Sequence, residues 1–488
     1  MKKKRENLRI HYLYLFFVFF FIILLVRVAY LQIIQKDLFQ NLAAEQHFNI
    51  VPLKGERGRI LDCRNRVLAI NLNVYSVFAD PELIVDREKT AATLSLYLNM
   101  DEQYFLSLLN KKSRFVWLKR KISLDEKINM ERLNLDGIGF IKDRLRFYPQ
   151  VDLLSHILGG VNIDNQGIEG IELFYDNYLR GKDGSVSIVK DSAATSLFFY
   201  PQIFESTKGV DVYLTVDAQI QYWVEKFLKE TIDQFSASAG GVVVMNPATG
   251  AIIALANMPA YDPNCINSTE SESLRNRAVT DIFEPGSVFK IVSLVAALDK
   301  KLFPLEDVIF CENGAYKIPG TVLHDFRPYG NLTFKEVFKK SSNIGVSKIA
   351  NAIGKDDLCR YIKVMGFGRE TGIDLHGEAK GFLKPVRVWS KTSPYIIPIG
   401  QEIGVTLIQL AQAISSIANG GYLVRPYLAE QLKGDYGYSR QTKKQRKRIF
   451  SSSVALDAKN ILIEVVDDGT GRYAKVGGFT VGGKTGTA

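Results

Sequence analysis

The sequence predicts an α+β protein with a single N-terminal membrane anchor. Residues 10–34 are almost wholly apolar, and this run is long enough to span a bilayer. Short apolar runs at 240–246 and 251–257 flank a Pro-Ala-Thr-Gly turn, which indicates a β-hairpin. Residues 218–233 show the spacing of an amphipathic helix directly after a strand-like alternation at 211–217. A chain of 488 residues has room for about two to four domains of this mixed kind.

The apolar run is predicted to be a signal anchor rather than a cleaved signal peptide. Residues 12–26 carry no charge, and Arg27 can extend its head group towards an interface. No small-x-small cleavage site follows, since bulky residues such as Tyr30 and Leu31 stand there. Lysines precede the span and few follow it, so residues 1–9 are expected in the cytoplasm and the rest outside.

Charge and the rarer residue types exclude several functions. The chain has 62 Lys and Arg residues and 52 Asp and Glu residues, so its net charge is +10, spread along the sequence. The basic clusters at 2–5 and 443–448 lack interleaved aromatic residues. Both observations argue against nucleic-acid binding. The cluster at 443–448 is predicted to be a solvated loop, with contact to anionic envelope polymers as the alternative. The 4 cysteines are far apart and the 5 histidines are scattered. This argues against a disulfide framework, a metal site and a His-based triad, and no cofactor is predicted.

The residues with the clearest chemistry are Glu284 to Lys290. A Pro-Gly pair precedes an apolar run at helical spacing, so Ser287 is expected in the first turn of a helix. Lys290 lies three residues further on, and positions i and i+3 share a helix face. A lysine amine can take the proton of a serine hydroxyl if its charged form is disfavoured.

Ser-x-x-Lys alone is a weak signal, because Ser187 to Lys190 forms a second copy in a Gly-rich stretch with no helix start. We interpret that copy as chance. The copy at Ser287 is followed by Ser341-Ser342-Asn343 and then by residues 484–487, Lys-Thr-Gly-Thr. These three motifs in this order are typical of penicillin-recognising serine acyltransferases.

A second resemblance lies upstream. Residues 57–69 resemble the segment that opens the non-catalytic pedestal of class B penicillin-binding proteins, the membrane-anchored peptidoglycan transpeptidases. Cys63 and Arg64 depart from the family's pattern, and Arg66 stands where Gly is usual. Gly there implies a turn with positive φ, so the local turn is expected to differ. Residues 146–149, with 156–160 and 166–172, resemble the cell-division branch of this class.

That last stretch holds His156, Glu169 and Glu172, which could suggest a metal site. Hydrogen bonds that hold the pedestal to the catalytic domain are the favoured interpretation. The resemblance implies four segments. These are a cytoplasmic tail (residues 1–9), a transmembrane anchor (10–34), an elongated β-rich pedestal or dimerisation domain (35–210), and a transpeptidase domain built as an antiparallel sheet flanked by helices (211–488).

The resemblance also predicts a strand at 479–488 that carries the Lys-Thr-Gly motif. In the family two more strands and a terminal helix follow it, and the chain ends before them. The expectation is a fragment of a longer product or an inactive remnant, because an unpaired sheet edge promotes aggregation and leaves the motif poorly placed.

In the family's chemistry, Ser287 attacks the penultimate carbonyl of a D-Ala-D-Ala stem peptide and an amine of a neighbouring strand takes the acyl group. Lys290 is the base, with a pKa that burial and Lys484 are expected to lower. Ser341 relays a proton and Asn343 holds the substrate amide. The terminal carboxylate is expected on Lys484, Thr485, Gly486 and Thr487, and the oxyanion hole in the N–H groups of Ser287 and Thr487.

The resemblance implies an enzyme of septal cell-wall synthesis in the cytoplasmic membrane, with its catalytic domain in the extracytoplasmic space. Its expected partners are stem peptides, β-lactams, the membrane and divisome proteins that include a glycosyltransferase. Two alternatives stay open. A non-catalytic division scaffold or inactive remnant fits the early end of the chain, and a serine β-lactamase shares the motifs but needs no anchor or pedestal.

Overall fold

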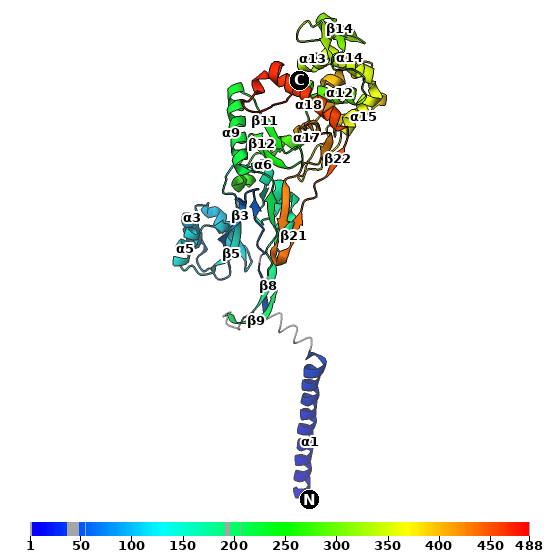
Figure 1. Ribbon diagram of the computed structural model, residues 1–488. Helices are drawn as coiled ribbons and strands as arrows, with labels where there is room; N and C mark the ends of the chain where they lie inside the picture. The colour runs from blue at the N-terminus through cyan, green and yellow to red at the C-terminus, as the bar shows by residue number, and fades with distance from the viewer. Residues whose placement is uncertain (1, 37–47, 54, 191–195, 205, 488) are drawn as a thin grey trace. The chain divides into compact units, whose positions relative to one another are not determined.

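The computed structural model describes residues 2–36, 48–53, 55–190, 196–204 and 206–487 (Figure 1). The chain forms two compact units. The first comprises residues 1–56 and 181–207, and the second comprises 57–180 and 208–488.

The first unit holds a long helix and a small antiparallel sheet. Helix α1 (Lys2–Ala29) continues into a π-helical turn (Tyr30–Ile34). Residues 11–34 are one helical stretch of 24 residues, long and apolar enough to cross a membrane, and no second one lies in the described parts of the chain. This helix fits the predicted anchor. The sheet has the order β1 (Phe48–Leu53), β8 (Gly184–Lys190), β9 (Ser196–Phe204).

The second Ser-x-x-Lys copy lies in strand β8 of this sheet. Ser187 pairs with Ile50 of β1. This segment is a strand and not the first turn of a helix. The structure therefore agrees with the interpretation of this copy as chance.

The second unit contains a mixed seven-stranded sheet that joins distant segments of the chain. Its order is β21-β20-β10-β2-β3-β4, and β5 also pairs with β3. Strands β10 and β2 are parallel, and the other pairs are antiparallel. The strand bounds are Ile60–Leu61 (β2), Val67–Ala79 (β3), Val116–Ile122 (β4), Ile138–Phe147 (β5), Asp211–Leu214 (β10), Ala429–Lys433 (β20) and Ser439–Gln441 (β21). Strands from both sides of residue 210 thus share one sheet.

Three helices and β3 and β4 enclose a separate small core. Helix α3 (Arg87–Leu98) begins where Asp86 accepts a hydrogen bond from the Lys89 N–H, and α5 (Leu124–Arg132) begins with a capping box at Ser123. Helix α4 (Glu102–Leu109) lies between them in the sequence. Their apolar faces bury Leu94 and Phe105 completely.

The turn between β2 and β3 differs from the family's pattern in one way. The positive φ expected at position 66 lies one residue earlier, at Asn65 with φ 63°. The Asp62 carboxylate accepts the N–H groups of Arg64 and Arg66, each at 2.8 Å, and so closes the turn without Gly at 66. Asparagine tolerates the left-handed region better than most residues.

A buried ionic cluster holds this part of the unit together. Glu172, on α7 (Gly170–Phe174), forms ion pairs of 2.6 Å with Arg57 and with Arg146. Arg57 also pairs with Asp176, the first residue of α8 (Asp176–Leu179), at 2.6 Å. Burial alone would raise the pKa of Glu172, but the two arginines outweigh it and lower the pKa.

The predicted hydrogen bonds to the catalytic region are present. His156, on α6 (Ser155–Leu158), contacts the Ser273 carbonyl through Nε2 at 2.9 Å, and its own carbonyl accepts from Asn276 Nδ2 at 3.1 Å. Tyr261 donates to the Ser155 carbonyl at 3.0 Å. Within the described ranges no group of His, Cys, Asp and Glu could hold a metal ion.

The rest of the second unit combines a β-hairpin with a helical core. The hairpin, β11 (Gly240–Met245) and β12 (Ile252–Met258), forms where predicted, and α9 (Ala218–Phe235) lies alongside it (Figure 1). The core packs six helices: α12 (Lys290–Asp299), α13 (Phe334–Lys339), α14 (Asn343–Ile353), α15 (Lys355–Val364), α17 (Leu407–Ala418) and α18 (Ser452–Asp468). Helix α14 runs to Ile353 and α17 spans 407–418, as predicted.

Short elements connect these helices. Two small hairpins lie ahead of α13 (Phe334–Lys339) and α14 in the sequence, and further two-stranded pairs flank α17. The strands are Val308–Phe310 (β13), Ala315–Ile318 (β14), Thr321–His324 (β15), Asn331–Thr333 (β16), Phe382–Leu383 (β17), Ile403–Gly404 (β18), Tyr422–Val424 (β19) and Arg446–Arg448 (β22). The short helices α10, α11 and α16 are Ser271–Leu274, Arg277–Thr280 and Ser393–Ile396.

The predicted strand at 479–488 is wrong for its described residues, 479–487. These residues form no strand, and the Gly483 N–H donates to the Leu462 carbonyl of α18 at 3.0 Å. A strand needs a neighbour that presents its own backbone groups at the right spacing. Here the segment lies against helix α18 instead. Its conformation is therefore set by single contacts and not by a row of backbone hydrogen bonds to a neighbouring strand.

Candidate active site

The Ser287 segment begins with a tight turn, as the Pro-Gly pair predicts. A 3₁₀ turn (Gly286–Phe289) leads into α12, and Gly286 has φ 52°. The Gly286 N–H donates to the Gly400 carbonyl at 3.3 Å, which ties the turn to the segment before α17. Phe289 is fully buried against Phe367 and anchors the turn in the helical core. Ser287 itself is half-buried.

Lys290 lies at the centre of the candidate site and is completely buried. Its Nζ donates to the Ser341 carbonyl at 2.7 Å, to Ser341 Oγ at 3.1 Å and to Asn343 Oδ1 at 2.7 Å. No hydrogen bond joins it to Ser287 Oγ among the described residues. In sites without substrate, such catalytic contacts are often long and shorten on binding.

The Ser341 hydroxyl lies between two amines. It accepts from Lys290 Nζ at 3.1 Å and from Lys484 Nζ at 2.9 Å. Ser341 has φ 56°, a left-handed conformation that is unfavourable for serine. This strained residue is the one whose carbonyl and hydroxyl oxygens both accept hydrogen bonds from Lys290. Ser342, next to it, is buried and caps α14.

The last motif lies against the Ser287 turn. A Cβ on Gly486 would lie 2.7 Å from Val288 Cγ2 and 3.2 Å from the Pro285 carbonyl oxygen, so only glycine fits there without displacement. Thr485 donates from its hydroxyl to Thr470 Oγ1 at 3.1 Å. Thr487 is exposed. The structure thus brings all three motifs together around Ser341.

The electrostatics of the two lysines differ from those of free amines. Burial, and then repulsion by Lys484, lowers the pKa of Lys290 from 10.5 to about 7. The same two causes were expected from the sequence. Burial lowers the pKa of Lys484 from 10.5 to about 8. At neutral pH a large fraction of Lys290 is therefore an uncharged amine, while Lys484 stays mainly cationic.

Asp325 is a residue of this site that the sequence analysis missed. Its carboxylate accepts the N–H groups of Asn343 and Ile344 at the start of α14, and the Ser342 hydroxyl at 2.6 Å. The neighbouring His324 carbonyl accepts from Asn343 Nδ2 at 2.9 Å. Asn343 is thereby held from two sides with its oxygen towards Lys290. No local pattern marks Asp325, because it lies outside every motif and reaches α14 only through tertiary structure.

We expect Asp325→Asn to alter both the rate and the pH profile of acylation. Loss of the Ser342 contact should loosen Asn343 and lower the maximal rate by about ten- to a hundredfold. The Asp325 charge also favours the protonated form of Lys290. The acid limb of the acylation rate should therefore move to lower pH in the variant, as measured by stopped flow with a chromogenic cephalosporin.

Glu312→Gln is the matched control for this variant. It removes a carboxylate that pairs with Lys348 at 2.6 Å near α14 but makes no contact with Asn343. Its profile should match the wild type. An unshifted acid limb in Asp325→Asn would show that the carboxylate acts only as a helix cap.

Comparison with known proteins identifies the family. Residues 240–488 match the penicillin binding protein transpeptidase domain, and residues 52–214 match the penicillin-binding protein dimerisation domain. The chain is 34% identical to stage V sporulation protein D of Bacillus subtilis, over 98% of this chain and 76% of that protein. The chain belongs to the class B penicillin-binding proteins.

Further relatives agree with this assignment. This penicillin-binding protein is 30% identical to the peptidoglycan D,D-transpeptidase FtsI of Escherichia coli, over 95% of the chain and 78% of the relative. Penicillin binding protein 3 from Mycobacterium tuberculosis has a similar solved structure, with a TM-score of 0.69 and 26% identity over 90% of this chain and 82% of that one. That protein has also been solved in complex with aztreonam and with ampicillin.

Proposed function

We propose that this penicillin-binding protein is a serine D,D-transpeptidase that cross-links peptidoglycan in septal wall synthesis and is acylated by β-lactams. The observation that carries the proposal is the Ser341 hydroxyl shared by two amines, one of them buried with a pKa of about 7. A scaffold has no need for such an arrangement, since a buried lysine with a lowered pKa destabilises the fold at neutral pH.

In the proposed reaction, Ser287 Oγ attacks the penultimate D-Ala carbonyl while its proton passes to the neutral Lys290 amine. The tetrahedral intermediate collapses, the C–N bond to the last D-Ala breaks, and Ser341 hands the proton on to the departing amine. An ester on Ser287 remains. An amine of a neighbouring strand then attacks that ester, loses its proton to the same relay and restores the Ser287 hydroxyl.

The remaining residues are proposed to bind the donor. Lys484 suits the terminal carboxylate, with the Thr485 and Thr487 hydroxyls beside it, through charge-assisted hydrogen bonds. Gly486 allows this segment to approach the Ser287 turn. The N–H groups of Ser287 and Thr487 are proposed as the oxyanion hole, where loss of one donor costs about 3–4 kcal/mol. Asn343 is proposed to hold the substrate amide.

The proposed setting follows from the N-terminal helix and the relatives. Helix α1 would anchor the protein in the cytoplasmic membrane, with residues 1–9 inside and the catalytic region outside, beside divisome partners that include a glycosyltransferase. We also propose that the pedestal domain spans residues 35–210 and the transpeptidase domain spans residues 211–488.

The direct test is the position of a covalent adduct. The full chain in detergent micelles is incubated with labelled penicillin, digested and analysed by mass spectrometry. The adduct should lie on Ser287, and Ser187 should carry none. An adduct elsewhere, or no adduct on a folded protein, would overturn the proposal and favour the scaffold.

The pKa values predict a bell-shaped pH dependence of acylation. Lys290 acts as a neutral amine, so the rate should rise as the pH passes about 7. Lys484 acts as a cation, so the rate should fall as the pH passes about 8. Because the two amines share the Ser341 hydroxyl, the observed values belong to the pair. In Lys484→Arg the alkaline limb should disappear, since a guanidinium stays protonated; an unchanged alkaline limb would assign it to another group.

A further inference from the structure

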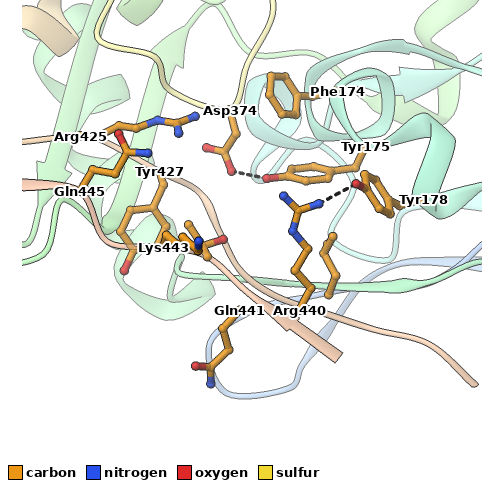
Figure 2. A pocket seen from close by; sticks show the side chains of 12 residues that line it. Phe174, Tyr175, Tyr178, Asp374, Arg425, Tyr427, Arg440, Gln441, Lys443 and Gln445 are labelled. Carbon is orange, nitrogen blue, oxygen red and sulfur yellow. Dashed lines mark hydrogen bonds between the residues drawn. The ribbon is translucent and has the colours of Figure 1, made fainter. Parts of the chain in front are cut away.

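A cavity of about 460 Å³ lies where α7 and α8 face the segment after β21. None of its lining residues belongs to the candidate active site. Its volume is within the range of about 300–1,000 Å³ that small-molecule sites occupy. Figure 2 shows Phe174, Tyr175 and Tyr178 on one side and Arg425, Tyr427 and Lys443 on the other.

The cavity has an excess of positive charge. Arg425, Arg440 and Lys443 line it, and Asp374 is the one acid among the described lining residues. That carboxylate is already engaged, because it accepts the Leu428 and Ala429 N–H groups at 2.6 and 2.7 Å and the Tyr175 hydroxyl at 2.8 Å. It is 3% exposed, so it contributes little to what a ligand would meet.

Donors in the cavity remain available. Arg425 donates from Nε to the Gly372 carbonyl at 2.5 Å, and its two terminal nitrogens have no hydrogen-bond partner within the described ranges. Lys443 is exposed and forms no ion pair with any described residue. Guanidinium groups with free N–H donors bind carboxylates and phosphates in a two-point manner.

The opposite wall is aromatic. Phe174, Tyr175 and Tyr178 come from α7 and α8, and Tyr427 lies across from them (Figure 2). Arg440 donates to the Tyr178 hydroxyl at 2.7 Å and lies over that ring, 6.0 Å from its centre. Burial raises the pKa of Tyr175 far above its usual value, so its phenol stays neutral and adds no negative charge.

We propose that this cavity binds an acidic glycan, with a sugar ring against the tyrosine wall and its acid group on Arg425 and Arg440. A small bare anion would leave the aromatic wall unused, and a neutral sugar would leave the excess positive charge of the cavity without a counter-ion. A peptidoglycan strand, which carries lactyl carboxylates on its sugar rings, has this chemistry, whereas a polyol-phosphate wall polymer supplies the anion without the ring. The site is separate from acyl transfer, and it would hold a strand beside the enzyme rather than react with it.

The test measures binding of three probes to the full chain in detergent micelles by titration calorimetry. The probes are peptide-free peptidoglycan strands with free lactyl carboxylates, poly(glycerol phosphate), and neutral N-acetylglucosamine oligomers. The carboxylate-bearing strands should bind, more weakly as salt is added, and neither the neutral oligomers nor poly(glycerol phosphate) should match them. Saturation by poly(glycerol phosphate) instead would show that the site recognises phosphate without a sugar ring and would overturn the proposal.

Charge-reversal variants of the lining residues test whether the probe binds in this cavity. Arg440→Glu and Lys443→Glu should each weaken binding by at least about tenfold. Lys447→Glu, on the neighbouring β22 but outside the cavity, makes the same charge change and should alter binding by less than about twofold. Lys443 has no contact to lose, so its variant tests the site even if Arg440→Glu disturbs Tyr178.

Acylation of Ser287 by penicillin serves as the fold check and should be unchanged in all three variants. Binding that survives both cavity substitutions, equal binding of the neutral oligomers, or no binding of the carboxylate-bearing strands would overturn the proposal. Each of these results is distinguishable from failure of the proposed transpeptidase, because acylation is measured separately.

Discussion

Replacement of Lys290 by Arg is expected to slow acylation by penicillin by about 10²- to 10⁴-fold, the usual contribution of a positioned base. The amine is completely buried and has a pKa of about 7, so it can lose its proton at neutral pH. A guanidinium cannot. The variant places a permanent positive charge near Ser341 and removes the ability to accept the proton of Ser287. The rate is measured by stopped flow with labelled penicillin.

The control for this variant is Lys484→Arg. In our proposal Lys484 acts as a cation, so an arginine should retain most of the rate at pH 7. Arginine is larger than lysine, and Lys290 is completely buried, so the larger side chain can also disturb the packing. Lys290→Ala with added methylamine therefore provides a second measurement, in which a small amine should restore part of the rate. Near wild-type acylation of Lys290→Arg would show that another group is the base.

Glu172→Gln is expected to destabilise the second unit by about 3–5 kcal/mol, as loss of one partner of a buried ion pair typically does. Both side chains of the Arg146–Glu172 pair are 0% exposed. Arg146 donates otherwise only to the Gly58 carbonyl and Asn71 Oδ1 among the described residues, and its Nη2 already lacks a partner. The substitution would leave a buried guanidinium without a counter-ion. Urea unfolding followed by fluorescence measures the effect.

Glu82→Gln is the matched control, since Glu82 pairs with Arg114 at 2.8 Å on the surface. It should leave the urea midpoint unchanged. The pH dependence gives a second check. The pKa of Glu172 is lowered below 4.5 in the folded state, so its stabilisation is present above that pH and is lost as the pH falls through the folded value. The difference between wild type and variant should shrink on acidification. Equal midpoints at neutral pH would contradict the role of this pair.

The sequence predicted those parts of the site whose residues lie close together in the chain. Ser287 and Lys290 are three residues apart, so a helix start alone brings them to one face. Helix α14 begins directly after Ser341 and Ser342, because Ser342 caps it. The convergence of Lys484 on Ser341 is a tertiary contact, and only the resemblance to a known set of motifs suggested it.

What the sequence could not predict depends on contacts between distant segments. Asp325 reaches the start of α14 from a different loop, and the pairing of β20 with β10 joins segments far apart in the chain. Strand patterns show that a segment is suited to a sheet but not which strand it will join. The predicted strand at 479–487 failed for the same reason, since its local pattern carries no information on whether a neighbour lies beside it.

The mixed sheet of the second unit has a consequence for the order in which the protein folds. Strands β3, β4 and β5 can pair with each other as soon as they have been made, because all three lie within residues 67–147. Strand β10 gains its second neighbour only when residues 429–433 have emerged. Throughout the synthesis of the hairpin, the Ser287 turn and helices α12 to α17, one edge of β10 presents unpaired backbone groups, which promote association with other chains. The nascent chain therefore needs protection at that edge until the last strands arrive.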